Sequence, residues 1–394
     1  MTSKTRLSIL LVTTPMLAFV IVGGLIGQER TGGDPTFRYL RVFDDVVSLV
    51  MSNYVEEVKI DRAMEGAMRG LADGLDPDSA YLDPRQARAV SAGETQPAGD
   101  VGLELTRQYY LRVIAARDGS PAARAGLQTG DFVRAIDGRP TREMSVFEGS
   151  RLLKGKPGSS VTVTVIRGNA ADPHDVKLVR EKPAPPPVTS RMVDEQIGYI
   201  RVASFHDGTP EALGQQAAQL AGSGARALLI DVRRAAEGPL ENGIAAARHF
   251  VRSGTLAIRA GRAEATDRHE FTAEASAARV TDLPVTLLVT AGTSGAGELF
   301  LAALDGNDRA EIVGERTIGR VGIQKFVPLP ENRGLWLTYA RYLTPAGEPI
   351  HGRGIEPDVR VDSPDVEFGA AAPDEDVMLD AALEHMRQRS RKAA

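Results

Sequence analysis

The amino-acid sequence predicts an α/β multidomain protein: an N-terminal membrane helix, a helical segment, a small β domain and an α/β core. Three observations support this prediction. The chain has 394 residues, which is more than one small domain usually contains. Its apolar residues pass from helical spacing to two-residue alternation near residue 101, and to alternating strands and helices after residue 189. Hydrophobic residues make up 42% of the chain and charged residues 25%, as in folded globular proteins.

Composition also excludes several classes of function. The chain contains no cysteine, so disulfides, thiolate metal sites and a cysteine nucleophile are excluded. Its six histidines never form a His-x-x-x-His pair, which argues against a histidine metal site. The net charge is −5 and no polybasic tract dominates, whereas phosphate binding needs a concentrated positive surface. We therefore expect no metal, no cofactor and no nucleic-acid partner.

The first residues predict where the folded part lies. Lys4 and Arg6 precede an uncharged, largely apolar run over residues 7–27, which is long enough to cross a bilayer as a helix. Positive residues remain on the cytoplasmic side, which places the N-terminus there. Because the run is longer than a usual signal-peptide core and lacks a clear Ala-x-Ala cleavage site, we expect residues 1–35 to be an uncleaved signal-anchor and linker. The folded part then lies in the periplasm, on a single-pass protein of the inner cell membrane. The alternative is a cleaved signal peptide and a secreted protein.

Residues 36–95 are expected to form a helical segment. Val42, Val46 and Val50 recur at helical spacing, and so do Met64 and Met68 further along. A stretch rich in Asp and Pro follows them and is expected to end the second helix in a turn.

Residues 96–182 are expected to form a β domain, because apolar residues alternate there with a period of two. The predicted strands are Gly102–Thr106, Arg112–Ala116, Phe132–Ile136 and Val161–Arg167, and the predicted helix is Val146–Leu153. The proline-rich residues 183–188 suit neither a helix nor a central strand. We expect them to be a stiff linker to the next domain.

Residues 189–362 are expected to form the α/β core, because near-continuous apolar strands alternate with helices and indicate a sheet buried on both faces. The predicted strands are Gly198–Ser204, Ala227–Val232 and Val285–Thr290, and the predicted helices are Pro210–Ala221, Gly243–Val251 and Gly297–Leu304. Residues 363–394 are expected to be an acidic tail followed by a helix from about Val377.

A glycine-rich turn, Gly292–Glu298, lies between the last predicted strand and helix of the core. By itself the turn allows four interpretations. Ser294 loosely resembles the serine of a nucleophile elbow, which would need a later acid and histidine. Glycines at a helix N-terminus also suit an anion, although no lysine follows as in a phosphate loop. The third interpretation is a catalytic turn of another serine-peptidase design. The fourth is a tight structural turn that needs glycine for its backbone conformation.

The order of motifs along the chain resembles that of the carboxyl-terminal processing (tail-specific) serine peptidases. The likeness runs from about Phe37 to Val361 and includes the segment Leu75–Leu82. The segments that resemble a PDZ domain of that family are Val101–Glu104, Ser120–Leu127 and Gly130–Gly138, and those that resemble its C-terminal signatures are Thr338–Gly347 and Gly352–Asp358. The resemblance implies a PDZ domain at residues 96–182 and a peptidase-like core at residues 189–362.

The positions that carry catalysis in this family are substituted here. The family's nucleophile is a serine three residues before the glutamate of the turn; counted from Glu298, that position is Gly295. The family's general base is the lysine of a Thr-x-Gly-Lys-x-x-x-Gln motif. Here Thr317–Gln324 places Arg320 at the lysine position, and of that pair only Gln324, which orients the lysine in the family, is kept.

The oxyanion region is altered too. The family motif Arg-Asn-Asn-Pro-Gly-Gly, whose glycine backbone contributes to the oxyanion hole, corresponds to Arg233–Gly238. Glu237 replaces its first glycine, and the resemblance assigns Gly238 and Ala296 to the oxyanion region. We expect Glu237 to repel the negative charge that develops there, or to form an ion pair with Arg320.

Elementary chemistry predicts that these substitutions abolish peptidase activity. Glycine has no hydroxyl to form an acyl-enzyme, and a guanidinium with a pKa above about 12 cannot accept a proton near neutral pH. Loss of a serine nucleophile alone lowers turnover by roughly 10⁶ in a protease benchmark. The alternative is an active endopeptidase of the same family that uses Ser294, one residue early, with another base. Lys325 lies on the opposite face if the strand continues, so it is a poor substitute.

The PDZ-like region shows no comparable loss. In PDZ domains an extended peptide adds to a sheet edge while backbone amides capture its terminal carboxylate. We expect Val101, Gly102, Leu103, Glu104 and Leu105 to do this. Apolar side chains from this segment and from the predicted helix either line a pocket or fill the domain's own core; they are Leu103, Leu105, Val146, Leu152 and Leu153. The expected partners are protein C-terminal tails and, in addition, an active paralogue or a second copy of the chain.

Overall fold

A computed structural model of the chain describes residues 35–168, 172–263, 267–273, 280–364, 366–370 and 375–393. The membrane helix predicted over residues 7–27 lies outside these residues. Within the described part of the chain, no helix is both long enough and apolar enough to cross a bilayer. The chain divides into two compact units, Met1–Ala67 and Met68–Ala394.

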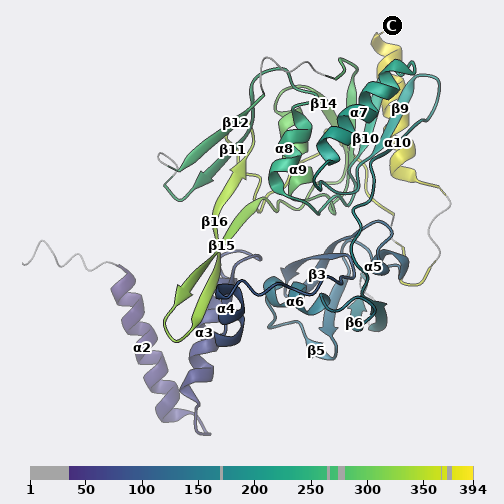
Figure 1. The fold of residues 1–394 in the computed structure, drawn as a ribbon. Coiled ribbons are helices and arrows are strands. Elements are labelled where there is room, and N and C mark those ends of the chain that lie inside the picture. Colours follow the sequence, from purple (N-terminus) through teal and green to yellow (C-terminus); the bar gives the residue numbers. More distant parts are fainter. Residues whose placement is uncertain are drawn as a thin grey trace, which may run out of the picture. The chain divides into compact units, whose positions relative to one another are not determined.

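The described part of the first unit is helical. Helix α2 spans Pro35–Asn53, and helix α3 spans Ile60–Asp73, so that α3 begins in the first unit and ends in the second (Figure 1). Both helices lie in the segment predicted to be helical. The apolar side chains of α2, such as Phe37 and Leu49, are exposed. Their helical spacing is therefore not matched by burial within the described chain.

A turn connects α3 to a short strand at the start of the second unit. The Asp76 carboxylate accepts backbone N–H groups in this turn. Strand β1 (Ala80–Leu82) then pairs with β16 (Arg333–Leu343), and helix α4 (Pro84–Ser91) follows, with the Asp83 side chain as its N-cap. This part of the predicted helical segment therefore contains a strand as well, because β1 finds its partner far along the chain.

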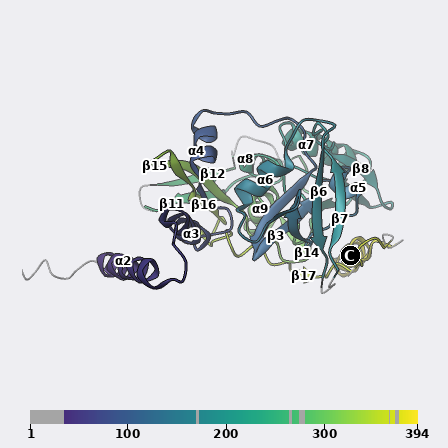
Figure 2. The same cartoon turned by 90° about the horizontal axis from the view of Figure 1, so that it is seen from below.

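The β domain is an antiparallel sheet accompanied by two helices. Its elements are β2 (Leu103–Gln108), β3 (Tyr110–Ala116), α5 (Pro121–Arg124), β4 (Phe132–Ile136), β5 (Arg139–Pro140), α6 (Val146–Leu153), β6 (Ser160–Ile166) and β7 (His174–Val179). The strand order is β2-β3-β4-β6-β7, so β2 is an edge strand, and β6 and β7 lie side by side in Figure 2. The inward positions of these strands form a separate hydrophobic core.

The α/β core is built on a six-stranded sheet in the order β17-β14-β13-β10-β9-β8. Its strands are β8 (Thr189–Met192), β9 (Ile197–Arg201), β10 (Ala227–Asp231), β13 (Val285–Val289), β14 (Ala310–Gly314) and β17 (Val359–Arg360). All but β8 run parallel, and the two central strands, β10 and β13, are buried at every position. This is the pattern expected of a sheet that helices cover on both faces.

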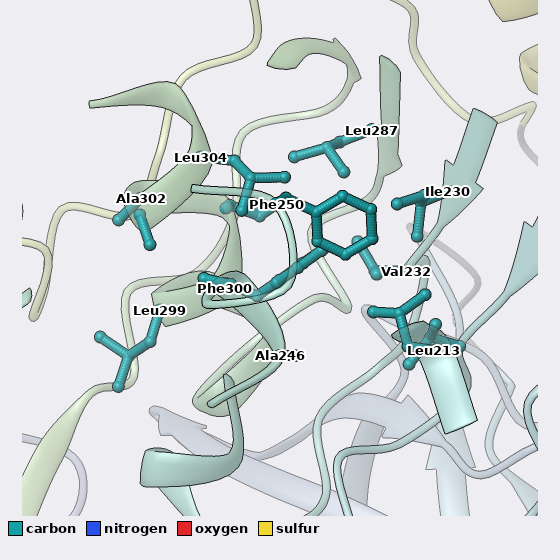
Figure 3. Packing of buried hydrophobic residues seen from close by; sticks show 14 of the residues in the cluster. Leu213, Ile230, Val232, Ala246, Phe250, Leu287, Leu299, Phe300, Ala302 and Leu304 are labelled. Carbon is teal, nitrogen blue, oxygen red and sulfur yellow. The ribbon is translucent and has the colours of Figure 1, made fainter. Parts of the chain in front are cut away.

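Helices cover the two faces of this sheet. Those on one face are α7 (Thr209–Gly222), α8 (Leu240–Ala247) and α9 (Ala296–Asp305), and α10 (Val377–Ala393) covers the other. Leu228 and Ile230 point toward α7–α9, whereas Leu229 between them points toward α10. Figure 3 shows Phe250 and Phe300 at the centre of the first cluster, with ring centroids 5.9 Å apart. Their burial fixes α9, and with it the turn that precedes α9.

A second, antiparallel sheet was not predicted. It has the order β1-β16-β11-β12, with β15 paired to β16, and its additional strands are β11 (Thr255–Gly261), β12 (Arg268–Thr272) and β15 (Gly322–Leu329). The β15–β16 hairpin turns at Glu331 and Asn332, both of which have positive φ. The sequence Arg320–Gln324 enters this hairpin, so the hairpin positions part of the candidate site.

Candidate functional site

The glycine-rich turn joins the buried strand β13 to helix α9. Thr293 Oγ1 donates to the carbonyl of Val232 at 2.9 Å, and the Ser294 N–H donates to the carbonyl of Ala235 at 3.2 Å. These bonds hold the turn against the residues that follow β10. Gly295, the last residue before α9, has φ of 60° and ψ of −119°. Glycine adopts this backbone conformation without the strain that a side chain would add.

Glu298 ties this turn to the second motif of the candidate site. Its side chain is fully buried and its carboxylate accepts four hydrogen bonds. Oε1 accepts from Thr317 Oγ1 and the Gly319 N–H, both at 2.5 Å, and Oε2 accepts from the N–H groups of Arg320 at 2.7 Å and Gly295 at 3.1 Å. Burial raises the pKa of the Glu298 carboxyl, and the four hydrogen bonds oppose that rise. One carboxylate therefore holds the backbone of residue 295 close to that of residue 320.

These elements enclose a pocket of about 300 Å³. Five residues that the sequence analysis singled out line it together: Gly238, Ser294, Gly295, Arg320 and Gln324. Ala296, the sixth residue assigned to the core site, is the first residue of α9 and is buried. The tertiary structure thus brings the segments after β10 and β13 and the start of β15 to one place.

The pocket has room for a side chain at position 295. A Cβ placed on Gly295 would lie 3.4 Å from Leu240 Cδ2 and 3.8 Å from the carbonyl oxygen of Arg320, which are ordinary contacts. The neighbouring atoms would therefore not crowd a serine side chain at this position. A serine would bear the positive φ, as the serine of a nucleophile elbow does on its strained strand-to-helix turn.

Arg320 is held by two carboxylates. Its Nε donates to Asp78 Oδ1 at 2.8 Å and its Nη1 donates to Glu104 Oε2 at 3.0 Å. Burial lowers the pKa of the Arg320 guanidinium, but the two carboxylates outweigh burial, so its pKa lies above the ordinary value. Burial likewise raises the pKa of the Glu104 carboxyl, and the positive charge of Arg320 opposes this rise. Arg320 is consequently a fixed cation and not a proton acceptor.

Glu237 does not pair with Arg320, which corrects the ion pair expected from the sequence. Its carboxylate instead accepts two hydrogen bonds from Arg117 Nη1, at 2.8 and 2.9 Å, and His206 Nε2 lies 3.4 Å from its Oε2. Arg117 follows strand β3 of the β domain. The negative charge expected to disturb the oxyanion region is therefore balanced by a cation that the sequence analysis did not assign to this site.

Ser294 is placed in the pocket but lacks a partner. The residue is 1% exposed, and among the described residues its hydroxyl has no hydrogen-bond partner. Lys325 is exposed and its Nζ lies 4.8 Å from the centroid of the Tyr339 ring, away from the pocket lining. Gln324 Nε2 donates to Thr338 Oγ1 at 3.2 Å. No base thus contacts Ser294 in the described chain.

The loop before β2 already holds a carboxylate of its own. Asp100 Oδ1 accepts the N–H groups of Val101 at 2.6 Å and Gly102 at 3.0 Å. The backbone of Asp100 is in turn bonded on both sides to Glu181, through N–H and C=O groups at 2.9 Å. Two of the amides predicted to capture a peptide's carboxylate are therefore occupied by a side chain of the same loop.

The predicted apolar pocket of the β domain is largely filled by its own core. The residues concerned that belong to that core are Leu103, Leu105, Val146 and Leu153, and Leu152 is partly buried against it. Helix α6 approaches closely: a Cβ on Gly149 would come within 2.3 Å of Leu111 Cδ1. Of the two interpretations of these side chains, core filling therefore describes the structure. Among the described residues, no strand pairs with the outer edge of β2.

Sequence reasoning missed the partners of the charged site residues. The sequence analysis placed Asp78 in a turn and Glu104 in the peptide-binding segment. It assigned no role to Arg117. Each lies far along the chain from its partner, so no local spacing relates them. The one available signal was that Asp78 and Glu104 both belong to segments that carry the family resemblance.

Comparisons with known proteins agree with this arrangement. Residues 196–361 match the model of peptidase family S41, and residues 112–167 match that of a PDZ domain. The chain is 31% identical to a carboxy-terminal-processing protease of Bartonella bacilliformis over 335 residues, which cover 84% of this chain and 76% of that protein. It is 27% identical over 359 residues to the carboxy-terminal processing protease CtpA of Bacillus subtilis, with 90% and 76% covered.

A solved structure of the photosystem II D1 C-terminal processing protease is also similar. It aligns with a TM-score of 0.66 and 30% sequence identity, covering 78% of this chain and 84% of that one. The match to the Bartonella protease covers 84% of this chain and therefore includes the β domain and most of the core. The chain therefore belongs to peptidase family S41, and its β domain is a PDZ domain.

Proposed function

We propose that this protein is a peptidase homologue that no longer cleaves peptides. The observation that carries the proposal is the pairing of Gly295 with Arg320 in one pocket, at the positions where the resemblance implies a serine and a lysine. The curated relatives are called processing proteases, and this chain keeps their fold. A covalent mechanism needs a nucleophile and a base in contact, and neither a hydroxyl at residue 295 nor an unprotonated amine at residue 320 is available.

A second candidate function is an active endopeptidase that uses Ser294. Its hydroxyl does line the pocket, which is the observation in its favour. However, a serine becomes nucleophilic only when a neighbouring base accepts its proton. The lack of any such contact among the described residues, together with the near-complete burial of Ser294, makes this function the weaker of the two.

We propose that the remaining activity is the binding of protein C-terminal tails by the PDZ domain, as a scaffold or regulator. Support comes from β2, which is an edge strand and therefore can pair with an extended peptide. The carboxylate of a tail would replace the Asp100 oxygen at the amides of Val101 and Gly102. We also propose, from the charge and apolar pattern of residues 1–35, that this binding takes place in the periplasm at the inner membrane.

The catalytic proposal is tested by restoring the missing groups. The double variant Gly295→Ser, Arg320→Lys is compared with the unaltered protein for cleavage of an unfolded protein and for labelling by a fluorophosphonate. We expect neither reaction in the unaltered protein and both in the double variant, because position 295 has room for the serine. Ser294→Ala is the matched control. Labelling of the unaltered protein that disappears in Ser294→Ala would overturn the proposal.

The binding proposal is tested with tail peptides. A fluorescent peptide with an apolar end and a free carboxylate is titrated with the protein, and its amidated form serves as the control. We expect a dissociation constant on the order of micromolar for the free carboxylate and at least about tenfold weaker binding after amidation. Equal binding of both peptides, or of neither, would contradict carboxylate capture.

A further inference from the structure

Arg320, which lines the pocket, and Glu237, which lies between the lining residues Ala236 and Gly238, both bond to the PDZ domain. Arg320 of the core donates to Glu104 of β2 at 3.0 Å, and Glu237 of the core accepts two bonds from Arg117, which follows β3. Each domain therefore contributes one cation and one anion to these two ion pairs. The resemblance implies a glycine at position 237, which would have no carboxylate. It implies a lysine at position 320, whose single ammonium group lacks the several fixed N–H donors of a guanidinium.

Burial makes these pairs specific. The side chains of Arg117 and Glu237 are only 8% and 14% exposed. A charge removed from water is tolerated when a partner of opposite charge is in hydrogen-bond contact, and removal of one partner leaves the other charge uncompensated. Arg320 is more accessible, at 28%, but it is bonded to Asp78 and Glu104 at once. Removing one partner in the docked molecule would therefore leave Arg117, Glu237 or Glu104 without its counter-ion, whereas Arg320 would keep Asp78.

Close packing surrounds the ion pairs. A Cβ on Gly292 would lie 2.6 Å from Thr129 Oγ1 and 2.9 Å from the carbonyl of Ile114, so the PDZ domain lies directly against the glycine-rich turn. Asp118 adds a third cross-domain contact, at 2.7 Å to Arg201 Nη2. The PDZ domain and the core thus meet along the same segments that frame the pocket.

We propose that residues 237 and 320 have become docking residues: the inactive site is the surface on which the PDZ domain is held in one fixed orientation. This inference rests on the proposed loss of catalysis, because a lysine that must accept a proton cannot also be held as a cation in a permanent ion pair between the domains. It assigns a physical role to the two charged substitutions themselves, Glu237 for glycine and Arg320 for lysine.

The test measures domain docking in the full chain. Because the chain contains no cysteine, Lys177→Cys in β7 and Ala218→Cys in α7 introduce the only two thiols, both at exposed positions, for spin labels. Electron paramagnetic resonance then gives the distribution of distances between the domains. We expect one narrow distribution in the doubly labelled protein. In Glu237→Gly and in Arg320→Gln we expect the ratio of docked to undocked molecules to fall about tenfold, which corresponds to about 1.4 kcal/mol.

Matched variants separate docking from general damage. Arg316→Gln removes an arginine whose ion pair with Glu356, at 3.1 Å, lies within the core, and it should leave the distribution narrow. The exchange Arg117→Glu with Glu237→Arg should restore docking that each single change loses. If a core variant fails to fold by circular dichroism, Arg117→Gln and Glu104→Gln test the same pairs from the PDZ side.

Narrow, unchanged distributions in the folded variants of both ion pairs would overturn the docking role. This outcome is distinct from failure of the proposed function, because cleavage by the unaltered protein would refute inactivity and would leave the measured distances as they are.

Discussion

At the scale of single residues, the core contains a buried carboxylate, Glu298, that links the two halves of the candidate site. The carboxylate oxygens of Glu298 accept four hydrogen bonds from N–H or O–H groups, and the donors come from both halves of the pocket. This bonding explains why Gly295 and Arg320 remain adjacent. The geometry of the site is thus maintained by an acceptor that takes no part in nucleophilic attack.

A second buried carboxylate, Asp231 at the end of β10, makes stability depend on pH. Burial tends to raise its pKa, but Arg201 and Arg233 outweigh burial and hold the pKa below its ordinary value of 3.8. A carboxyl with a lowered folded pKa contributes stability that is complete above the unfolded pKa and is lost as the pH falls through the folded value.

We therefore expect the free energy of unfolding to fall as the pH drops below about 4, in part through Asp231, whose folded pKa lies below the ordinary value of 3.8. Asp231→Asn should lower stability at pH 7, because Arg233 Nη2 loses an acceptor at 2.7 Å, and should make the acid dependence shallower. Urea unfolding at several pH values measures both effects. Asp172→Asn, at an exposed position, is the control, and an unchanged acid slope in Asp231→Asn would contradict the assignment.

At the scale of elements, the edge strand β2 and its preceding loop form the proposed binding site for a C-terminal tail. The loop is held at two points, by the bridge between Gly99 and Gly155 and by that between Asp100 and Glu181. A Cβ on Gly102 would lie 2.3 Å from Ser120 Cβ, so glycine is required for this close approach. The amides are consequently preorganised, with Asp100 as their internal acceptor.

Removal of that acceptor should strengthen capture of a free carboxylate. In Asp100→Ala the amides of Val101 and Gly102 lose their internal partner, and a peptide carboxylate would no longer compete with it. We expect affinity for the free-carboxylate peptide to rise about tenfold, and affinity for the amidated peptide to change little. Fluorescence anisotropy measures both, with Asp172→Ala as the control. A weaker response to the free carboxylate would show that Asp100 serves only to shape the loop.

Elements with a clear local period were predictable, whereas those that depend on distant partners were not. Helix Val146–Leu153 and the strand at Phe132–Ile136 have the predicted bounds. The β15–β16 hairpin was missed because its residues are mostly half-buried and mix charged and apolar side chains without a clean alternation. Asn332 was the one local signal, because asparagine adopts positive φ more readily than most residues and does so in this turn.

At the scale of the whole molecule, the C-terminal helix completes a sheet whose strands come much earlier in the chain. The inward side chains of α10, Met378 and Leu383 among them, pack on Leu229, Leu288 and Val313. These three strand residues face away from α7–α9. Without α10, one face of the sheet would expose apolar side chains to water.

Leu383→Ala should therefore destabilise the core as a whole. Leu383 is 5% exposed, and truncation of a buried leucine typically costs about 2–5 kcal/mol. Val377→Ala in the same helix is the matched control, because Val377 is 50% exposed and its truncation should cost far less. Thermal unfolding of the two variants compares the effects. Equal midpoints would show that α10 does not stabilise the sheet.

The sequence by itself determined the local chemistry of this protein: which segments are helical or extended, and that residue 295 has no hydroxyl and residue 320 is a permanent cation. These properties depend on residue type and on neighbours a few positions away. Only the tertiary structure decided which charge meets which. Arg320 binds Asp78 and Glu104, and Glu237 binds Arg117, because long-range strand pairing and domain packing place them within hydrogen-bond reach. The spacing of apolar residues along the chain does not indicate a contact between residues so far apart in the sequence.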